Sequence, residues 1–368
     1  MACAIALALT CTVGVGSAVA ASPAVVEFSN GLNAGDFVIS IAQGQNGNMW
    51  FTVDGGSPAI GEISPSGAIS MYSTGLNSGS QPLIITPGAN GSMWFTDDGS
   101  TPAIGKITAN GTITEYSTGL VVGGLPYDIK LGTQGDMWFT DPLGEAIGRV
   151  TPAGAISEFS TGLNPGSSPL FITTAGSEGM WFTDQGSTPA VGRIDALGAI
   201  TEYSTGLRPE DAPGAITRGL NGTAWFTETG PGGAIGRITP GGTITTFKSG
   251  LNWGAAPYRL TLGADGNVWF TDPGRTPAIG RITSSGAITE YSSGLLHDAA
   301  PSQITAGPHG VWFSDPGSKS VGRINPAGMI AEFRTGSLPA SPDAIAAGAG
   351  PAVWFVDDAG PAIGRING

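Results

Sequence analysis

The stretch WFTDPGRTPAIGRITSSGAITEY, residues 269–291, belongs to a unit that is repeated along the chain. The Trp-Phe pair at its start occurs eight times, at intervals of 42 to 44 residues. The tryptophans of these pairs are Trp50, Trp94, Trp138, Trp181, Trp225, Trp269, Trp312 and Trp354. Because self-similarity at a period of about 40–45 residues is typical of β-propeller blades, this repeat decides the fold.

Each repeat is predicted to form four short strands, which we call A to D. In the third repeat they cover residues 126–131, 137–140, 146–150 and 155–160. The strands are rich in β-branched and aromatic residues, and the C–D turn has Pro152 and Gly154 where a type I turn favours them. No long segment shows the 3.6-residue period of a helix. The predicted fold class is therefore all-β.

The two ends of the chain predict how the ring closes. Residues 364–368 stop where strand D of the last repeat should begin, whereas residues 25–32 match strand D and follow no repeat. The N-terminal strand is therefore expected to complete the last blade of a single eight-bladed β-propeller of four-stranded blades. An open array would leave strand edges exposed. Seven blades with one detached repeat is the alternative.

Residues 1–20 are predicted to be a signal peptide and residues 21–368 the propeller. The first segment is apolar and uncharged and ends in Ala18-Val19-Ala20, a small-x-small cleavage pattern, although it lacks a basic start. Cys3 and Cys11, the only two cysteines, lie inside it. We therefore expect a secreted protein, periplasmic or extracellular, with no thiol and no membrane span in the mature chain.

Composition limits the partners of the protein. Of its 368 residues 40% are hydrophobic, enough for a large core, and only 12% are charged. The net charge of -13 argues against nucleic acids and anionic membranes as partners, because both need a basic surface. We expect a monomer that binds a small molecule or an extracellular protein.

Residues that recur from repeat to repeat are interpreted as scaffold. The Trp and Phe of strand B should pack between blades, and the Gly of strand C should leave room for that Trp. A basic residue follows this Gly in seven repeats, as Lys106, Arg149, Arg193, Arg237, Arg281, Arg323 and Arg365. Because these residues are spread one per blade and outnumbered by acids, we interpret them as salt-bridged or solvated.

An acidic residue lies three places after the Trp in seven repeats. These residues are Asp97, Asp141, Asp184, Glu228, Asp272, Asp315 and Asp357. A ring of carboxylates can bind cations, yet Asp before a turn that contains Gly or Pro also bonds to its own backbone. We favour the turn-forming interpretation and keep the cation interpretation for places where several acids converge.

Function is expected where one blade departs from the others. The D–A loops vary most, and together with the B–C loops they emerge at one end of the ring, which we call the D–A face. Candidate ligand-binding residues in this region are Phe37, Tyr127, Asp128, Trp253, Tyr258, Arg259, His297 and Asp298. Aromatic walls with a few charges are typical of small-molecule pockets.

Few side chains are suited to catalysis. The only two histidines, His297 and His309, are predicted on opposite faces, which argues against a Ser-His-Asp triad or a histidine metal cluster. Asp343, Asp357 and Asp358 are the candidates for an oxygen-only Mg²⁺ or Ca²⁺ site. Asp343 and Asp358 are also the candidate catalytic residues.

The pattern Trp-Phe-Thr-Asp…Pro-Ala-Ile-Gly-Arg-Ile-Thr-Pro-x-Gly-x-Ile-Thr-Glu-Tyr, matched at residues 269–291 except that Ser284 stands where the pattern has its second Pro, resembles the streptogramin B lyase (virginiamycin B lyase) family of β-propellers. The resemblance extends over essentially the whole predicted mature chain. It implies seven-bladed lyases that open the ester-closed ring of streptogramin B antibiotics by elimination, with Mg²⁺ held by glutamates and a histidine as general base. This chain has one repeat more.

The family's functional residues are replaced here. Carried over from the C-terminal end, the base histidine falls on Asp343 and a second functional histidine on Ser302. The glutamate before the last strand-A Pro becomes Ser341, and the metal-binding glutamate after the last Trp becomes Asp358. Both imidazoles are lost, although a buried Asp can serve as a base when its pKa is raised.

Three hypotheses about function follow. An intact scaffold with an altered catalytic set favours a secreted ligand- or protein-binding module. The alternative is a metal-dependent carbon–oxygen lyase of the virginiamycin B lyase type, which would confer antibiotic resistance, or a related hydrolase. A structural role in the cell envelope is the third.

Overall fold

A computed structural model of the chain describes residues 24–336 and 340–367. These residues form strands, loops and two short 3₁₀ helices, η1 (Ala89–Gly91) and η2 (Gly176–Glu178). Neither of them is long and apolar enough to cross a membrane, nor is any other helix in the described part of the chain. The predicted signal peptide, residues 1–20, lies outside the described residues.

The strands assemble into eight antiparallel sheets of four strands, each sheet forming one blade. Blades 1 to 4 contain β2 (Asp36–Gln43), β3 (Met49–Gly55), β4 (Ala59–Ile63), β5 (Ile69–Tyr72); β6 (Pro82–Pro87), β7 (Met93–Asp97), β8 (Ala103–Ile107), β9 (Ile113–Tyr116); β10 (Ile129–Leu131), β11 (Met137–Asp141), β12 (Ala146–Val150), β13 (Ile156–Phe159); and β14 (Pro169–Thr174), β15 (Met180–Asp184), β16 (Ala190–Ile194), β17 (Ile200–Tyr203). Blades 5 to 8 contain β18 (Pro213–Arg218), β19 (Ala224–Glu228), β20 (Ala234–Ile238), β21 (Ile244–Phe247); β22 (Leu260–Leu262), β23 (Val268–Asp272), β24 (Ala278–Ile282), β25 (Ile288–Tyr291); β26 (Ile304–Gly307), β27 (Gly310–Asp315), β28 (Ser320–Ile324), β29 (Ile330–Arg334); and β30 (Pro342–Ala347), β31 (Ala352–Asp357), β32 (Ala362–Asn367) with β1 (Val25–Phe28).

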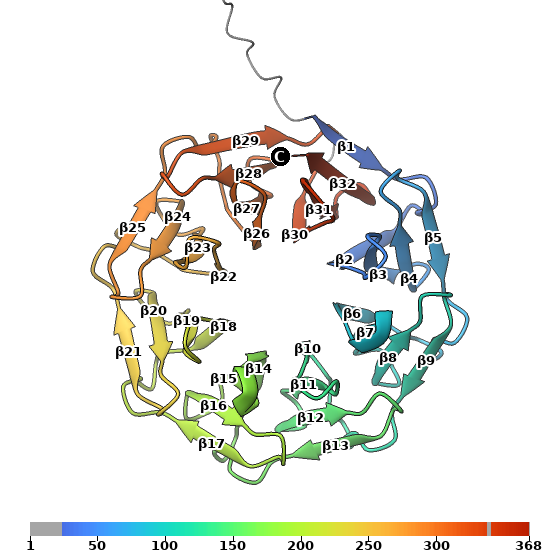
Figure 1. The fold of residues 1–368 in the computed structure, drawn as a ribbon, viewed down its shortest axis with the longest axis horizontal. Coiled ribbons are helices and arrows are strands. Elements are labelled where there is room, and N and C mark those ends of the chain that lie inside the picture. The colour runs from blue at the N-terminus through green and yellow to red at the C-terminus, as the bar shows by residue number, and fades with distance from the viewer. Residues whose placement is uncertain (1–23, 337–339, 368) are drawn as a thin grey trace, which may run out of the picture.

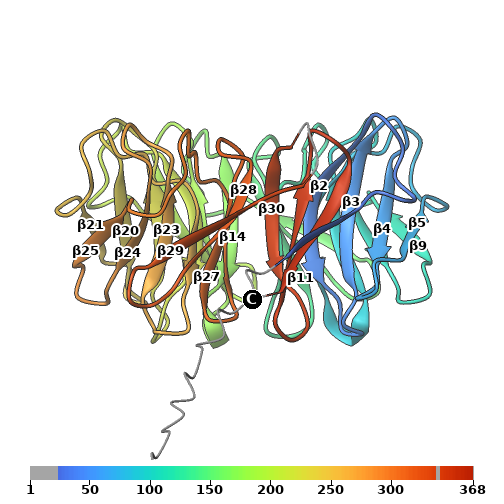
Figure 2. The same cartoon turned by 90° about the horizontal axis from the view of Figure 1, so that it is seen from above.

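The blades stand radially around a central axis. The first strand of each blade lies next to the axis and the last lies at the rim (Figure 1), and the loops emerge at the two ends of the ring (Figure 2). The predicted eight-bladed β-propeller is thereby confirmed.

The ring closes through the N-terminal strand. β1 pairs with β32 in antiparallel register, with Val25 opposite Ile366 and Phe28 opposite Ile363. The last blade is therefore built from both ends of the described chain, as the sequence predicts. This arrangement uses strand pairing to prevent the ring from opening.

Each boundary between blades, which we call a seam, is filled by a Trp of one blade and a Phe of the next. The pairs that share a buried cluster are Trp50–Phe95, Trp94–Phe139, Trp138–Phe182, Trp181–Phe226, Trp225–Phe270, Trp269–Phe313, Trp312–Phe355 and Trp354–Phe51. These Trp side chains are at most 4% exposed and the Phe side chains 0%. Because neighbouring residues of a strand point to opposite sides of the sheet, one Trp-Phe pair serves two seams.

The strand-C glycine makes room for the Phe and not for the Trp, so that part of the sequence interpretation is wrong. A Cβ added to Gly61 would lie 2.1 Å from Phe51 Cζ, because the two residues are paired across β3 and β4. The Trp is instead approached by the glycine that follows strand A. A Cβ at Gly44 would lie 2.6 Å from Trp50 Nε1.

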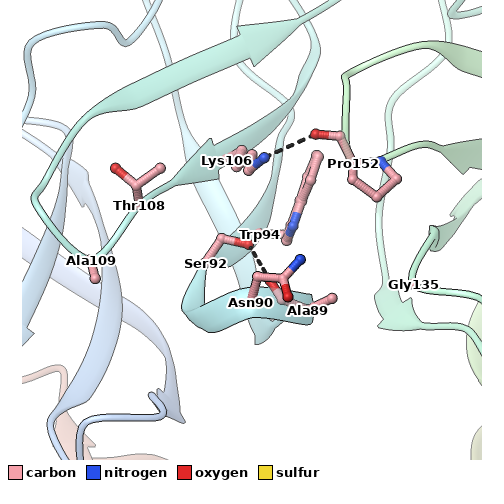
Figure 3. A pocket seen from close by; sticks show the side chains of 9 residues that line it. All are labelled: Ala89, Asn90, Ser92, Trp94, Lys106, Thr108, Ala109, Gly135 and Pro152. Carbon is pink, nitrogen blue, oxygen red and sulfur yellow. Dashed lines mark hydrogen bonds between the residues drawn. The ribbon is translucent and has the colours of Figure 1, made fainter.

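The recurring basic residues lie over the Trp rings and bond to the next blade. Lys106 Nζ lies 5.2 Å from the centroid of the Trp94 ring and donates a hydrogen bond of 2.9 Å to the Pro152 carbonyl (Figure 3). The same donation to the next C–D turn is made by Arg149, Arg193, Arg237, Arg281 and Arg365. The salt-bridged or solvated interpretation is therefore incomplete, since cation–π contacts and carbonyl acceptors hold these side chains.

The closing strand also contacts blade 1. The Phe28 ring stacks on Trp354 with centroids 6.0 Å apart. It also covers Gly67, where an added Cβ would lie 2.0 Å from Phe28 Cε1. Gly67 has φ of +92°, a conformation that favours glycine. Phe28 thus joins blade 8 to blade 1.

We predict that Phe28→Ala lowers the free energy of unfolding by about 2 kcal/mol, below the cost at a fully buried Phe because the ring is half-buried. Val26→Ala, on the same strand but 40% exposed, is the matched control and should have a smaller effect. Urea unfolding followed by tryptophan fluorescence measures both. Equal effects of the two substitutions would contradict the role of Phe28 in closure.

Candidate functional site

A buried hydroxyl near the end of strand B holds the start of strand A in two neighbouring blades. Thr271 Oγ1 accepts the N–H of Arg259 at 3.2 Å and donates to the Ser302 carbonyl at 2.7 Å. Thr140 Oγ1 does the same between Asp128 and Leu170. Both threonines are 0% exposed. The residues around the axis at the D–A face are therefore held in place from both sides.

The D–A face contains a pocket of about 450 Å³ where the strand-A segments of blades 3 to 6 meet. Its lining residues are Tyr127, Leu170, Phe171, Gln185, Gly214, Ala215, Thr229, Ala256, Pro257, Tyr258, Arg259 and Pro273. We call it the mouth pocket. Blade 5 contributes Gly214 and Ala215 to the lining, where blade 4 has Leu170 and Phe171 and blade 6 has Tyr258 and Arg259.

Aromatic rings and one guanidinium shape the mouth pocket. The rings of Tyr127 and Phe171 meet edge to face, with centroids 5.5 Å apart. The Cζ atom of Arg259 lies 4.6 Å from the Phe171 centroid and 4.2 Å from that of Tyr258. Burial raises the pKa of Tyr127, and the positive charge of Arg259 opposes this rise. The Arg259 side chain therefore reaches from blade 6 across blade 5 to a ring of blade 4.

Of the residues named from the sequence, the structure brings Tyr127, Tyr258 and Arg259 together around this pocket. Asp128, 5% exposed, instead serves the scaffold. Its carboxylate accepts the N–H of Ile172 in the next blade at 3.0 Å and pairs with Lys130 at 2.5 Å.

The other candidates do not line the mouth pocket. Phe37 is 51% exposed on β2, and Trp253 is 77% exposed and stacks on Arg275, whose Cζ lies 4.5 Å from the ring centroid. His297 Nδ1 lies 2.7 Å from Asp298 Oδ2 in an exposed loop. Phe37 belongs to strand A of blade 1, whereas the pocket is lined by blades 3 to 6, and Trp253, His297 and Asp298 lie in D–A loops outside the lining.

Sequence reasoning missed Phe171 and Gln303. Both occupy the second position after the strand-A Pro, the position from which Asp128 and Arg259 were chosen for their charge. Gln303 Oε1 accepts a hydrogen bond from Arg259 Nε at 3.3 Å. The second position after the strand-A Pro was recognised as a candidate position, but only its charged residues were selected, so Phe171 and Gln303 were missed.

The acids after strand B support the loops, which confirms the turn-forming interpretation. Asp97 Oδ1 accepts the N–H groups of Gln81 and Gly99, both at 2.8 Å. Asp184 makes the equivalent bonds to Ser168 and Gly186 at 2.7 Å. These carboxylates are buried beneath the D–A face and do not form a ring open to cations.

A strand-D Glu lies beside this Asp in most blades. Burial, together with the neighbouring Asp, raises the pKa of Glu115, Glu202 and Glu290 to about 8. Blade 1 replaces both acids by apolar residues, Val53 and Met71.

Blade 5 lacks the Glu and has Glu228 in place of the Asp. Burial raises the pKa of Glu228 to about 7, and neither of its carboxylate oxygens has a hydrogen-bond partner.

Asp343, Asp357 and Asp358 are the candidate metal residues, and Mg²⁺ requires several oxygen ligands that converge on one point. Asp357 accepts the N–H groups of Ser341 and Ala359, and Asp343 accepts the Ser302 hydroxyl at 3.0 Å. Asp357 Oδ2 and Asp358 Oδ1 are buried and have no hydrogen-bond partner. In residues 24–336 and 340–367 no three His, Cys, Asp or Glu side chains are grouped to hold a metal ion. The residues therefore do not fit the Mg²⁺ site that the resemblance implies.

Comparison with known proteins gives consistent matches. The profile of the Virginiamycin B lyase family matches residues 25–250 and 208–368. A catalytically inactive His-to-Ala variant of virginiamycin B lyase from Staphylococcus aureus, solved with quinupristin, is 30% identical with a TM-score of 0.65, covering 94% of this chain and 99% of that one. A streptogramin B lyase structure is also 30% identical, with a TM-score of 0.64, covering 94% and 97%.

More distant structures share the fold alone. YCF48 from Cyanidioschyzon merolae is 12% identical with a TM-score of 0.57, covering 94% of this chain and 99% of that one. No curated protein gives a significant match.

The Glu residues with raised pKa predict how stability depends on pH. Their folded-state pKa is about 8 against an ordinary value of 4.5, so the folded state binds the protons more tightly than the unfolded chain. The contribution of these Glu residues to the free energy of unfolding should therefore be greatest below about pH 4.5 and be lost as the pH rises through about 8. Thermal unfolding followed by circular dichroism measures this dependence.

The triple variant Glu115→Gln, Glu202→Gln and Glu290→Gln should depend less on pH, because Gln is uncharged throughout. Glu178→Gln, at an exposed Glu paired with Arg193, is the control and should keep the wild-type dependence. An unchanged slope in the triple variant would contradict this account.

Proposed function

The chain belongs to the virginiamycin B lyase family. We propose that it binds a small organic molecule in the mouth pocket and does not cleave the bound molecule. The observation that carries this proposal is the pocket itself, with Tyr127, Phe171, Tyr258 and Arg259 around about 450 Å³. A pocket of this size with aromatic walls and few polar groups is typical of small-molecule sites.

The histidines of this chain support binding over cleavage. The solved relative in complex with quinupristin is described as inactive with one His changed to Ala. Here the two histidines of the chain lie away from the mouth pocket. His297 is on an exposed loop, and His309 lies in the A–B hairpin at the opposite face. Neither imidazole is placed to act as a base on a molecule in this pocket.

One observation favours the lyase or a related hydrolase as a second candidate. Burial raises the pKa of Asp358 to about 7, with Asp343 and Asp357 adding to the rise. A carboxyl that titrates near neutral pH is suited to general acid–base catalysis. Asp343, which accepts a hydrogen bond from Ser302, is near enough to Asp358 to act on its carboxyl electrostatically.

Quinupristin tests these alternatives. We predict that the wild-type protein binds it in calorimetry and returns it unchanged, with or without added Mg²⁺. Phe171→Ala should weaken binding about tenfold, since a buried aromatic contact is lost. Ile84→Ala is the matched control, because Ile84 holds the same position in blade 2, the second after the strand-A Pro, and lies outside the pocket lining.

Chromatography and mass spectrometry report the fate of the ring. Elimination opens it without a change of mass but with a new retention time, whereas hydrolysis adds the mass of one water. Either product would contradict the binding-only proposal. Absence of binding would remove streptogramins as ligands, and equal effects of Phe171→Ala and Ile84→Ala would place the site elsewhere.

We also propose that the protein acts outside the cytoplasm as a monomer. The apolar residues 1–20 and their Ala18-Val19-Ala20 ending support export. N-terminal sequencing of the protein recovered from the periplasm or medium should begin at Ala21. An uncleaved chain retained in the cytoplasm would contradict export, and light scattering would show any oligomer.

A further inference from the structure

Arg259 is the one charged residue among the described residues that line the mouth pocket. Its guanidinium lies between the rings of Phe171 and Tyr258, with Cζ-to-centroid distances of 4.6 and 4.2 Å. The residue is half-buried. A positive charge is thus held in a mainly apolar recess, where solvent compensates it less than at an open surface.

The donors of Arg259 are only partly used. Nε donates to Gln303 Oε1 at 3.3 Å, and the Tyr127 hydroxyl is a further hydrogen-bond partner. A guanidinium has five N–H donors in one plane. The contacts with the Phe171 and Tyr258 rings use no N–H donor, so the remaining N–H groups can donate two parallel hydrogen bonds to a carboxylate.

No protein carboxylate neutralises Arg259. None of the ion pairs within the described ranges includes it, although the chain carries a net charge of -13. Asp128, the acid at the equivalent position of blade 3, is turned to Lys130 and to the Ile172 N–H. The charge at the mouth pocket is therefore available to a ligand.

Most of the arginines that follow the strand-C Gly both stack on a Trp and bond to a carbonyl of the next blade. Arg237 stacks on Trp225, 5.4 Å from the ring centroid, and donates to the Ser284 carbonyl of the next blade at 2.7 Å. Arg259 is stacked in a similar way but donates to no backbone carbonyl within the described structure. Arg323, which stacks on Trp312 with Cζ 5.4 Å from the ring centroid, shows no carbonyl acceptor in the described structure either. Arg259 is therefore distinguished by its place in the lining of the mouth pocket.

We propose that Arg259 selects ligands in which a carboxylate lies close to an aromatic ring. The carboxylate would pair with the edge of the guanidinium, and the ring would lie against the apolar wall. This inference rests on the proposed function, because it assumes that the mouth pocket is the binding site.

The experiment compares hippurate (N-benzoylglycine) with hippuramide, which has the same ring but no charge. Affinity is measured by ligand-observed NMR on the full chain. The wild-type protein should prefer hippurate about tenfold, as expected for a charge-assisted hydrogen bond. This comparison needs no variant and is unaffected by any loss of folding.

Variants assign the preference to its residue. In Arg259→Gln the two probes should bind equally, and Arg259→Lys should keep part of the preference because the charge remains. Arg275→Gln is the matched control, since Arg275 also stacks on an aromatic ring, Trp253, but lies outside the pocket lining. It should keep the wild-type preference.

The outcomes separate this inference from the proposed function. A protein that binds quinupristin but neither probe, or both probes equally, overturns the role of Arg259 and leaves the pocket as the binding site. A preference for hippurate that persists in Arg259→Gln also overturns it. Loss of quinupristin and probe binding together overturns both proposals.

Discussion

The contact between the Trp of one blade and the Phe of the next is the constraint on which the rest of the structure depends. It is made at every seam, including the one between Trp354 and Phe51 that closes the ring. Because the two residues are adjacent on strand B and point to opposite sides, each blade can satisfy both neighbours only in a closed circle. The pairing of β1 with β32 then holds that circle together.

The same constraint decides where function can lie. Strand B, strand C and the loop-supporting acids are committed to the seams and turns, so little variation is tolerated there. The start of strand A is held by buried hydroxyls such as Thr271 through its backbone, which leaves its side chains free to differ. Gly214, Phe171 and Arg259 line the mouth pocket. The repeated scaffold thus carries, at the mouth pocket, side chains that differ from blade to blade.

Much of this could be predicted from the sequence, because the repeat reports packing that is the same in every blade. The Trp-Phe period predicts the number of blades, and the segment Val25–Phe28 predicts the strand that completes the last blade. Contacts across the axis have no such period. Arg259 of blade 6 contacts Phe171 of blade 4 across blade 5, and no repeat reports this contact. The strand-C glycine was assigned to the wrong aromatic ring because the strand register was unknown.

The Asp–Glu pairs were hidden for a related reason, since strand C and the turns on both sides of it separate the two acids in the sequence, and only the sheet brings them together. The central claim is that the family's scaffold here presents a binding pocket, not a working lyase site. A crystal structure of the protein with quinupristin tests it most directly. The account predicts an intact ring seated against Phe171 and Tyr258. An opened molecule beside Asp343 and Asp358, or one bound at the opposite face, would contradict it.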